Sequence, residues 1–412
     1  MACARLAALG SQQTEARKVG DSIYVGLGFG NTFLVATKDG NVIIDTSLPI
    51  FAARHKALLT KARPEPVKYV ILTHAHEDHT GGLALWTQTG AKVIAQKNFP
   101  EVIHYQDMLA GFFGARNAAQ FGFPEMTVRS FQRNRASKVE ANILFDERYD
   151  FDLGGLHFEL HHTPGETPDA CSIWIPELKA AFVGDNLYPA FPNIYTLRGT
   201  RPRWATDYIT SLDKVRNWQP EYLLPSHGEP IEGREAVAAA LKKYRDAIAY
   251  VHDATVRGMN EGKDVHAVMR EVKLPPELAI PEIYGEVSWS VRGIYEGYVG
   301  WFDGNPANMY STPVDSVYPD MVELAGGADA VAERARKLLS EGSDPVKSLH
   351  LAEVALRAEP KSIAALQAKQ AALEALKKKS ANAIEEAWLE SGLRKTRAAI
   401  KEAHSPTTSG MK

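Results

Sequence analysis

What the sequence lacks already limits the class of protein. Its 412 residues include only two cysteines, Cys3 and Cys171, which excludes a disulfide framework and a zinc site built from paired cysteines. No segment approaches the roughly 20 apolar residues that a membrane-spanning helix requires. An excess of one charge is missing too, because 47 Lys and Arg are mixed with 50 Asp and Glu. Without a basic face for nucleic acid, we expect a globular protein that acts on a small molecule.

The N-terminal stretch MACARLAALG is apolar but too short for the hydrophobic core of a signal peptide together with its cleavage site. It would suit the remnant of a trimmed leader in a bacterial periplasmic or secreted protein. It would equally suit a cytoplasmic protein, so the sequence leaves the compartment open.

The pattern of the chain changes near residue 235. Before it, glycine-bounded apolar runs such as DSIYVGLG, NTFLVAT and NVIIDTS predict short strands, and later apolar runs repeatedly end in a potential ligand residue. After it, alanine- and leucine-rich stretches cut by glycine and proline predict helices. We therefore predict an N-terminal segment over 1–18, an α/β domain over 19–235, an all-helical domain over 236–385, and a C-terminal helix with a disordered tail over 386–412.

The most informative stretch is ILTHAHEDHTGG, in which a predicted buried strand ends in His74, His76, Asp78 and His79. Histidines in a loop are often merely solvated, but such a string would arise by chance in about one chain in a thousand, so it favours a metal site. Alternate residues of an extended loop point the same way. His74 and His76 can therefore bind one ion, while Asp78 and His79 turn toward a second.

Four ligands are too few for two catalytic ions, because each zinc takes about three protein ligands and keeps one position open for water. Three more residues lie at predicted strand ends followed by turns: Glu166 in HHTPGETPDA, Asp185 in FVGDN and His227 in LLPSHGEP. The simpler alternatives are a solvated loop carboxylate for Glu166 and a turn cap for Asp185. As ligands, the three would complete both metal sites.

With this ligand set the sequence resembles the metallo-β-lactamase superfamily over about residues 19–235. The commonest superfamily pattern has a histidine after TPG, whereas a glutamate there, as in Glu166, is similar to the zinc-dependent alkyl sulfatase family. Two later segments, NIYTLRGTRPR and YGEVSWSVRGIYEGYVGWFDGNP, also resemble that family and extend the likeness over about residues 20–380. The fold implied is an αββα sandwich followed by an all-α dimerisation domain, and hence a homodimer.

The resemblance also implies a set of site residues. Two Zn²⁺ ions per subunit would be bound by His74, His76, Asp78, His79, Glu166, Asp185 and His227. Asp185 would bridge the ions, and we count both Asp78 and Asp185 as catalytic. Asp45 in VIIDTS matches an aspartate that orients a metal ligand from behind.

A sulfate-binding role is implied for Asn193 and Arg198 in NIYTLRG. A guanidinium suits that role because its planar fork of donors matches a tetrahedral oxyanion and keeps its charge at any working pH. Arg234, shortly after His227, would add a second contact to the sulfate.

Two departures from the alkyl sulfatase pattern narrow the expected substrates. Family members usually carry a glutamate at the position of Asp185, although either carboxylate can bridge two ions. Long-chain alkyl sulfatases carry a further C-terminal domain that resembles sterol carrier protein, and this sequence ends without it. We therefore expect a short form of the family that acts on short, secondary or aryl sulfate esters rather than on long-chain detergents.

The function expected is hydrolysis of a sulfate ester by a metal-activated water, which releases sulfate and an alcohol. One alternative is another hydrolase on the same scaffold, namely a lactonase, a thioesterase, or a phosphoesterase or phosphonoesterase. A sulfate-binding site distinguishes these from a sulfatase. The other alternative is a non-catalytic dimer that keeps its metals for structure, and turnover of any sulfate ester would exclude it.

Overall fold

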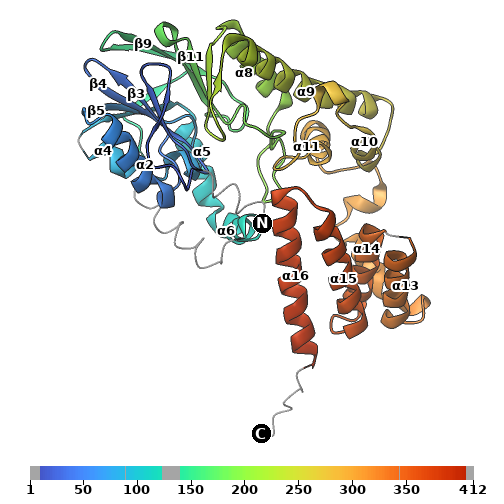
Figure 1. Ribbon diagram of the computed structural model, residues 1–412. Coiled ribbons are helices and arrows are strands. Elements are labelled where there is room, and N and C mark those ends of the chain that lie inside the picture. The colour runs from blue at the N-terminus through green and yellow to red at the C-terminus, as the bar shows by residue number, and fades with distance from the viewer. Residues whose placement is uncertain (1–9, 89, 123–139, 343, 405–412) are drawn as a thin grey trace. The chain divides into compact units, whose positions relative to one another are not determined.

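The computed structural model describes residues 10–88, 90–122, 140–342 and 344–404 (Figure 1). These residues form two compact units. The first unit holds the described residues up to 118 and those from 140 to 298. The second holds 119–122 and the described residues from 299 onward.

The first sheet of the first unit has seven strands in sequence order: β1 (Arg17–Val19), β2 (Ile23–Gly26), β3 (Thr32–Thr37), β4 (Gly40–Ile44), β5 (Val67–Ile71), β6 (Lys92–Gln96) and β7 (Ile143–Phe145). Strands β1 to β4 are antiparallel, and β4 to β7 are parallel. Its helices are α2 (Pro49–Ala62), α3 (Glu77–Thr80), α4 (Leu83–Thr87), α5 (Phe99–Met108) and α6 (Ala110–Phe121). Because β4 and β5 are parallel, the residues that follow them emerge at the same edge.

The second sheet has six strands: β8 (Arg148–Leu153), β9 (Leu156–His162), β10 (Cys171–Ile175), β11 (Ala180–Gly184), β12 (Tyr222–Pro225) and β13 (Ile231–Glu232). Its order is β13-β12-β11-β10-β9-β8. Strands β11 and β12 are parallel because helix α8 (Ala205–Asn217) connects them, and the other neighbours are antiparallel. The ends of β11 and β12 therefore also meet at one edge.

The core between the sheets consists of side chains from both of them. Phe33 on β3 meets Phe182 on β11 edge to face, with ring centroids 5.3 Å apart. The outer face of the first sheet is covered by α2, α4 and α5, and that of the second by α8 and the helix that begins at residue 234 (Figure 1). Two sheets between two helical layers confirm the expected αββα sandwich.

The first unit continues well past the predicted boundary near residue 235. Helices α9 (Arg234–Asn260), α10 (Val265–Glu271) and α11 (Val287–Val299) follow β13. Val237, Leu241 and Ile248 of α9 are fully or almost fully buried in the same apolar cluster as residues of α8 and β11. This packing explains why the chain divides after Tyr298 rather than near 235.

The second unit is helical within its described residues. It comprises α12 (Tyr318–Leu324), α13 (Ala328–Glu341), α14 (Pro345–Ala358), α15 (Ile363–Lys379) and α16 (Ala383–His404). Small residues such as Ala335, Ala352 and Ala368 meet in one buried cluster, which allows neighbouring helices to approach closely. The predicted C-terminal helix is part of α16, and the predicted tail from 405 lies outside the described residues, as do residues 1–9 of the N-terminal segment. Among the helices that are described, none is long and apolar enough to cross a membrane.

Candidate active site

Strand ends deliver the predicted ligand residues to one place. His74 follows β5, and His76 directly precedes the single-turn helix α3, which carries Asp78 and His79. Glu166 lies in the connection from β9 to β10. Asp185 follows Gly184, whose positive φ of 54° turns the chain at the end of β11, and His227 follows β12. The structure thus brings all seven predicted ligand residues together.

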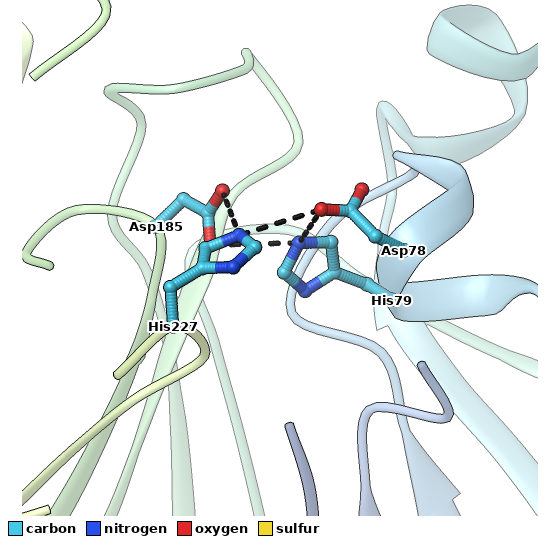
Figure 2. A group of neighbouring side chains, drawn as sticks. All are labelled: Asp78, His79, Asp185 and His227. Carbon is cyan, nitrogen blue, oxygen red and sulfur yellow. Dashed lines mark hydrogen bonds and ion pairs between the residues drawn. The ribbon is translucent and has the colours of Figure 1, made fainter. Parts of the chain in front are cut away.

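Four of these residues form a tight group, in which one ligand atom from each lies within 4.8 Å of all the others. Figure 2 shows Asp78, His79, Asp185 and His227 turned toward one another. His227 Nε2 lies 3.1 Å from Asp185 Oδ2 and 3.4 Å from Asp78 Oδ2. His79 Nε2 lies 3.4 Å from Asp185 Oδ1. Two imidazole nitrogens and two carboxylates are donors that suit zinc.

The hydrogen bonding of this group supports a bound cation. His79 Nε2 and Asp185 Oδ1 are buried without a hydrogen bond of adequate geometry, and a buried polar atom left without a partner is costly. Burial opposes a charged imidazolium, yet the nearby carboxylates of Asp185 and Asp78 raise the pKa of His227 to about 10. The group therefore attracts positive charge, and a metal ion would displace protons from it.

The remaining three ligand residues lie beside this group. His74 Nε2 is 2.9 Å from His76 Nδ1, and His76 Nδ1 is 3.7 Å from Glu166 Oε1. The ring centroids of His74 and His79 are 4.0 Å apart, which joins the two sets of ligands. Burial, and then the neighbouring His79, lower the pKa of His74 to about 3. The imidazole of His74 is therefore neutral, which is the form that binds a metal.

Asp45 lies behind this group, fully buried at the end of β4 with a positive φ of 55°. Its Oδ2 atom lies 2.7 Å from His79 Nδ1 and accepts hydrogen bonds from Ser226 Oγ at 2.7 Å and Thr73 Oγ1 at 2.8 Å. Its Oδ1 atom accepts one from the Thr73 amide at 2.8 Å. This geometry suits an orienting carboxylate, and the role stays a prediction.

Glu166 has two partners that the sequence did not reveal. The guanidinium of Arg203 contacts Glu166 Oε1 and also donates from Nη1 to the carbonyl of Asn193 at 2.8 Å. The hydroxyl of Tyr208 on α8 donates to Glu166 Oε2 at 2.9 Å. Arg203 lies in the quoted motif RGTRPR, so its place in that segment was the available signal. Tyr208 follows an ordinary helical pattern and carried none.

Of the two predicted sulfate-binding residues Asn193 and Arg198, only Arg198 lines a cavity with the predicted ligand residues. Arg198 lines a cavity of about 300 Å³ together with His76, Glu166 and Arg203, and its Nη2 atom lies 3.4 Å from His76 Nε2. Asn193 is 3% exposed, and its Oδ1 atom is buried without a hydrogen-bond partner. The cavity therefore places a guanidinium directly beside two predicted ligand side chains.

The structure does not bring Arg234 to this site. Strands β12 and β13 are antiparallel, with Tyr222 opposite Glu232, so the chain returns to the end of β12 that lies away from His227. Arg234 then begins α9, exposed, with its guanidinium on the side chain of Gln219. The predicted second contact to the sulfate is therefore wrong.

Comparison with known proteins matches both parts of the chain. The model of the metallo-beta-lactamase superfamily matches residues 25–227, and the model named alkyl sulfatase dimerisation matches residues 264–398. A linear primary-alkylsulfatase from a Pseudomonas species is 32% identical over an alignment of 322 residues that covers 72% of this chain and 61% of the relative. An (R)-specific secondary-alkylsulfatase from Pseudomonas is 31% identical over an alignment of 349 residues that covers 77% of this chain and 52% of the relative.

The solved structures that resemble the chain include the stereoselective inverting sec-alkylsulfatase Pisa1 from Pseudomonas. It superposes with a TM-score of 0.82 at 27% identity, covering 95% of this chain and 66% of Pisa1. A double mutant of the same enzyme gives a TM-score of 0.85, covering 97% of this chain and 68% of that protein. The chain spans only 61% and 52% of the two curated relatives above.

Proposed function

Because this chain belongs to the alkyl sulfatase family of the metallo-β-lactamase superfamily, we propose that it hydrolyses sulfate esters with a metal-activated water and releases sulfate and an alcohol. One observation carries the proposal. Arg198 lines the same cavity as His76 and Glu166, so an anion bound by its guanidinium would lie next to the metal ligands. Neither a lactonase nor a thioesterase needs a cation at that position for its uncharged acyl group.

We propose that the metal centre holds two Zn²⁺ ions. One ion would be held by His74, His76 and Glu166 and the other by Asp78, His79 and His227, with Asp185 between them. The strongest support for this arrangement is that the buried atoms His79 Nε2 and Asp185 Oδ1 face each other at 3.4 Å without a well-formed hydrogen bond. Zinc, when bound, would act as a Lewis acid and lower the pKa of a water bound to it, which provides hydroxide near neutral pH.

The side chains have separate tasks in this proposal. Arg198 binds and orients the sulfate oxygens, assisted by Asn193. Asp78 and Asp185 supply negative charge that retains the metals, and Asp45 holds the ring of His79 in one orientation through the 2.7 Å contact to Nδ1.

The cavity favours a compact organic group. Beyond its polar residues it is lined by Val102, Tyr105, Pro168, Pro202 and Trp204. Its volume of about 300 Å³ is at the small end of ligand pockets, which commonly span roughly 300 to 1,000 Å³. Short, secondary or aryl sulfates fit this apolar wall, and Trp204 offers an aromatic surface to an aryl group.

We also propose that the protein is a homodimer. The alkyl sulfatase dimerisation model matches the chain over 264–398. Exposed apolar side chains of the second unit include Trp301 at 74%, Tyr310 at 69% and Leu324 at 89%. Such surfaces are typical of protein contacts.

The proposal is tested by a panel of substrates run on protein of known metal content. The panel holds a primary, a secondary and an aryl sulfate, with an aryl phosphate, a phosphonate, a lactone and a thioester as controls. We expect metal-dependent turnover of at least one sulfate ester, which chelation abolishes and zinc restores. Turnover of a control substrate without any sulfate ester would instead favour one of the other hydrolases, and no turnover of any ester would favour a binding protein.

A further inference from the structure

We propose that Arg116, on helix α6, is a positioning residue that fixes Arg198 in the orientation needed to bind the sulfate group. The inference rests on the proposed function, because it concerns the same anion site. Arg116 is not among the residues that line the cavity. It would therefore act on the substrate only through Arg198.

Arg116 binds the backbone at Arg198 and at the residue before it. Its Nε atom donates to the carbonyl of Arg198 at 2.6 Å, and its Nη2 atom donates to the carbonyl of Leu197. One rigid, planar guanidinium thus binds two successive carbonyls. Such a pair of bonds restrains both the position and the rotation of this loop segment.

The aromatic side chains of α6 complete the support. The guanidinium carbon of Arg198 lies 5.7 Å from the ring centroid of Phe113, within the range of a cation–π contact. The guanidinium carbon of Arg116 lies 5.1 Å from the ring centroid of Phe112. Helix α6 therefore contacts both the main chain and the side chain of Arg198.

Gly199, the next residue, forms a turn that lies against α6. Its φ is 100°, a conformation that strongly favours glycine, and its amide donates to the carbonyl of Thr196 at 2.9 Å in a tight turn. A Cβ atom at this position would lie 3.4 Å from the ring of Phe112 and 3.8 Å from that of Phe113. The turn is thus shaped to dock against α6 immediately beyond Arg198.

The docking determines where the Arg198 guanidinium can lie. Its Nη2 atom is 3.4 Å from His76 Nε2, so a small shift of the loop would move the anion site relative to the metal ligands. An arginine side chain has many rotamers, and only some of them reach the cavity. The contacts to the backbone of Arg198 and to one face of its guanidinium therefore favour the rotamers that reach the cavity.

The test compares Arg116→Met, Arg116→Lys, Arg198→Ala and the double variant Arg116→Met/Arg198→Ala at equal metal content. We expect Arg116→Met to lower kcat/KM for a sulfate ester by roughly ten- to hundredfold, because small misplacements of a binding group have effects of that size. The inhibition constant of free sulfate should rise in parallel. Arg116→Lys should restore part of the loss, since an ammonium can still donate to these carbonyls.

The double variant separates positioning from a general structural role. Because Arg116 acts through Arg198, removing both side chains should be no worse than Arg198→Ala alone. A matched control is Arg54→Met on α2, where a half-buried arginine likewise donates to two carbonyls, those of Gly10 and Leu27. The control should leave kcat/KM for the sulfate ester unchanged.

Three outcomes would overturn the inference: wild-type kcat/KM in Arg116→Met, losses that multiply in the double variant, or an equal loss for an uncharged ester. Free sulfate provides a separate measurement, because its binding to the metal-loaded protein can be followed by calorimetry without turnover. Weaker sulfate binding in Arg116→Met would support the inference even if no ester were cleaved. In that case only the proposed function would fail.

Discussion

Replacing Asp45 with asparagine is the most informative perturbation of the metal centre. Asparagine has almost the same shape and tolerates the positive φ of this position, so the backbone need not change. The carboxylate, however, accepts four hydrogen bonds, three of them on Oδ2. The asparagine amide has two possible orientations, and each one places its NH₂ group against hydrogen-bond donors. In one orientation the donor is the Thr73 amide, and in the other the NH₂ group faces the Oδ2 partners, which include His79.

The expected magnitude follows from these contacts. A hydrogen bond to a charged group contributes about 1.5 to 3 kcal/mol, and Asp45 supplies that bond to a fully buried histidine. The loss corresponds to roughly a ten- to hundredfold weaker affinity for the metal, the usual effect of removing such a supporting group. Because His79 belongs to the four-residue group of Figure 2, the loss should fall on the ion that this group binds.

Competition between the protein and a chelator measures the effect. We expect Asp45→Asn to release one ion at a lower chelator concentration than the wild type does. The other ion should be released at about the same chelator concentration in both proteins. The matched control is Asp213→Asn on α8, a half-buried aspartate outside the predicted ligand set whose carboxylate pairs with Arg216 and Arg245. Equal metal affinities in Asp45→Asn and wild type, or equal losses in both variants, would refute an orienting role for Asp45.

Three further predictions concern the metals, the pH dependence and the assembly. Asp185→Ala should lower the metal content and abolish activity, because its two oxygens face His79 and His227; a fully active variant would contradict the dinuclear centre. Burial lowers the pKa of His55 from 6.5 to about 4. Between these two pH values only the unfolded chain gains the proton, so the free energy of unfolding should fall by up to about 3 kcal/mol as the pH drops from 6.5 to 4. Urea unfolding should show that the free energy of unfolding of His55→Gln falls less over that pH range than that of the wild type. An identical pH profile in the two proteins would contradict this role of His55. Light scattering should give twice the subunit mass at micromolar concentration, and a strict monomer would leave Trp301 as an ordinary exposed residue.

The seven candidate ligand residues could be identified from the sequence because their signal is local. His74, His76, Asp78 and His79 lie within one short string, and the other three predicted ligands each follow an apolar run. Tyr208 and Arg116 gave no such signal, and the only signal for Arg203 was its place in the motif RGTRPR. Their roles arise from packing between segments far apart in the sequence, such as the 81 and 82 positions that separate Arg116 from Leu197 and Arg198.

Two differences between the predictions and the structure have the same origin. Arg234 follows His227 by only seven positions, but strand β13 lies between them and runs back along β12, which takes Arg234 away from the site. The predicted boundary near 235 marked a real change from strands to helices. Helical periodicity shows that α9 has an apolar face but not which surface it covers, and α9 packs with α8 on the second sheet.

The central claim is that the site is built for a sulfate ester, and Arg198→Ala tests it most directly. The measurement is kcat/KM for a sulfate ester and for an uncharged ester or lactone that the wild type also cleaves, with both proteins at full zinc occupancy. Loss of a charged donor to the anion should cost about 2 to 4 kcal/mol in transition-state stabilisation toward the sulfate ester and much less toward the uncharged substrate. An equal loss for both substrates, or none for the sulfate ester, would contradict a sulfate-binding role for Arg198 and leave the chain a metal-dependent hydrolase of another class.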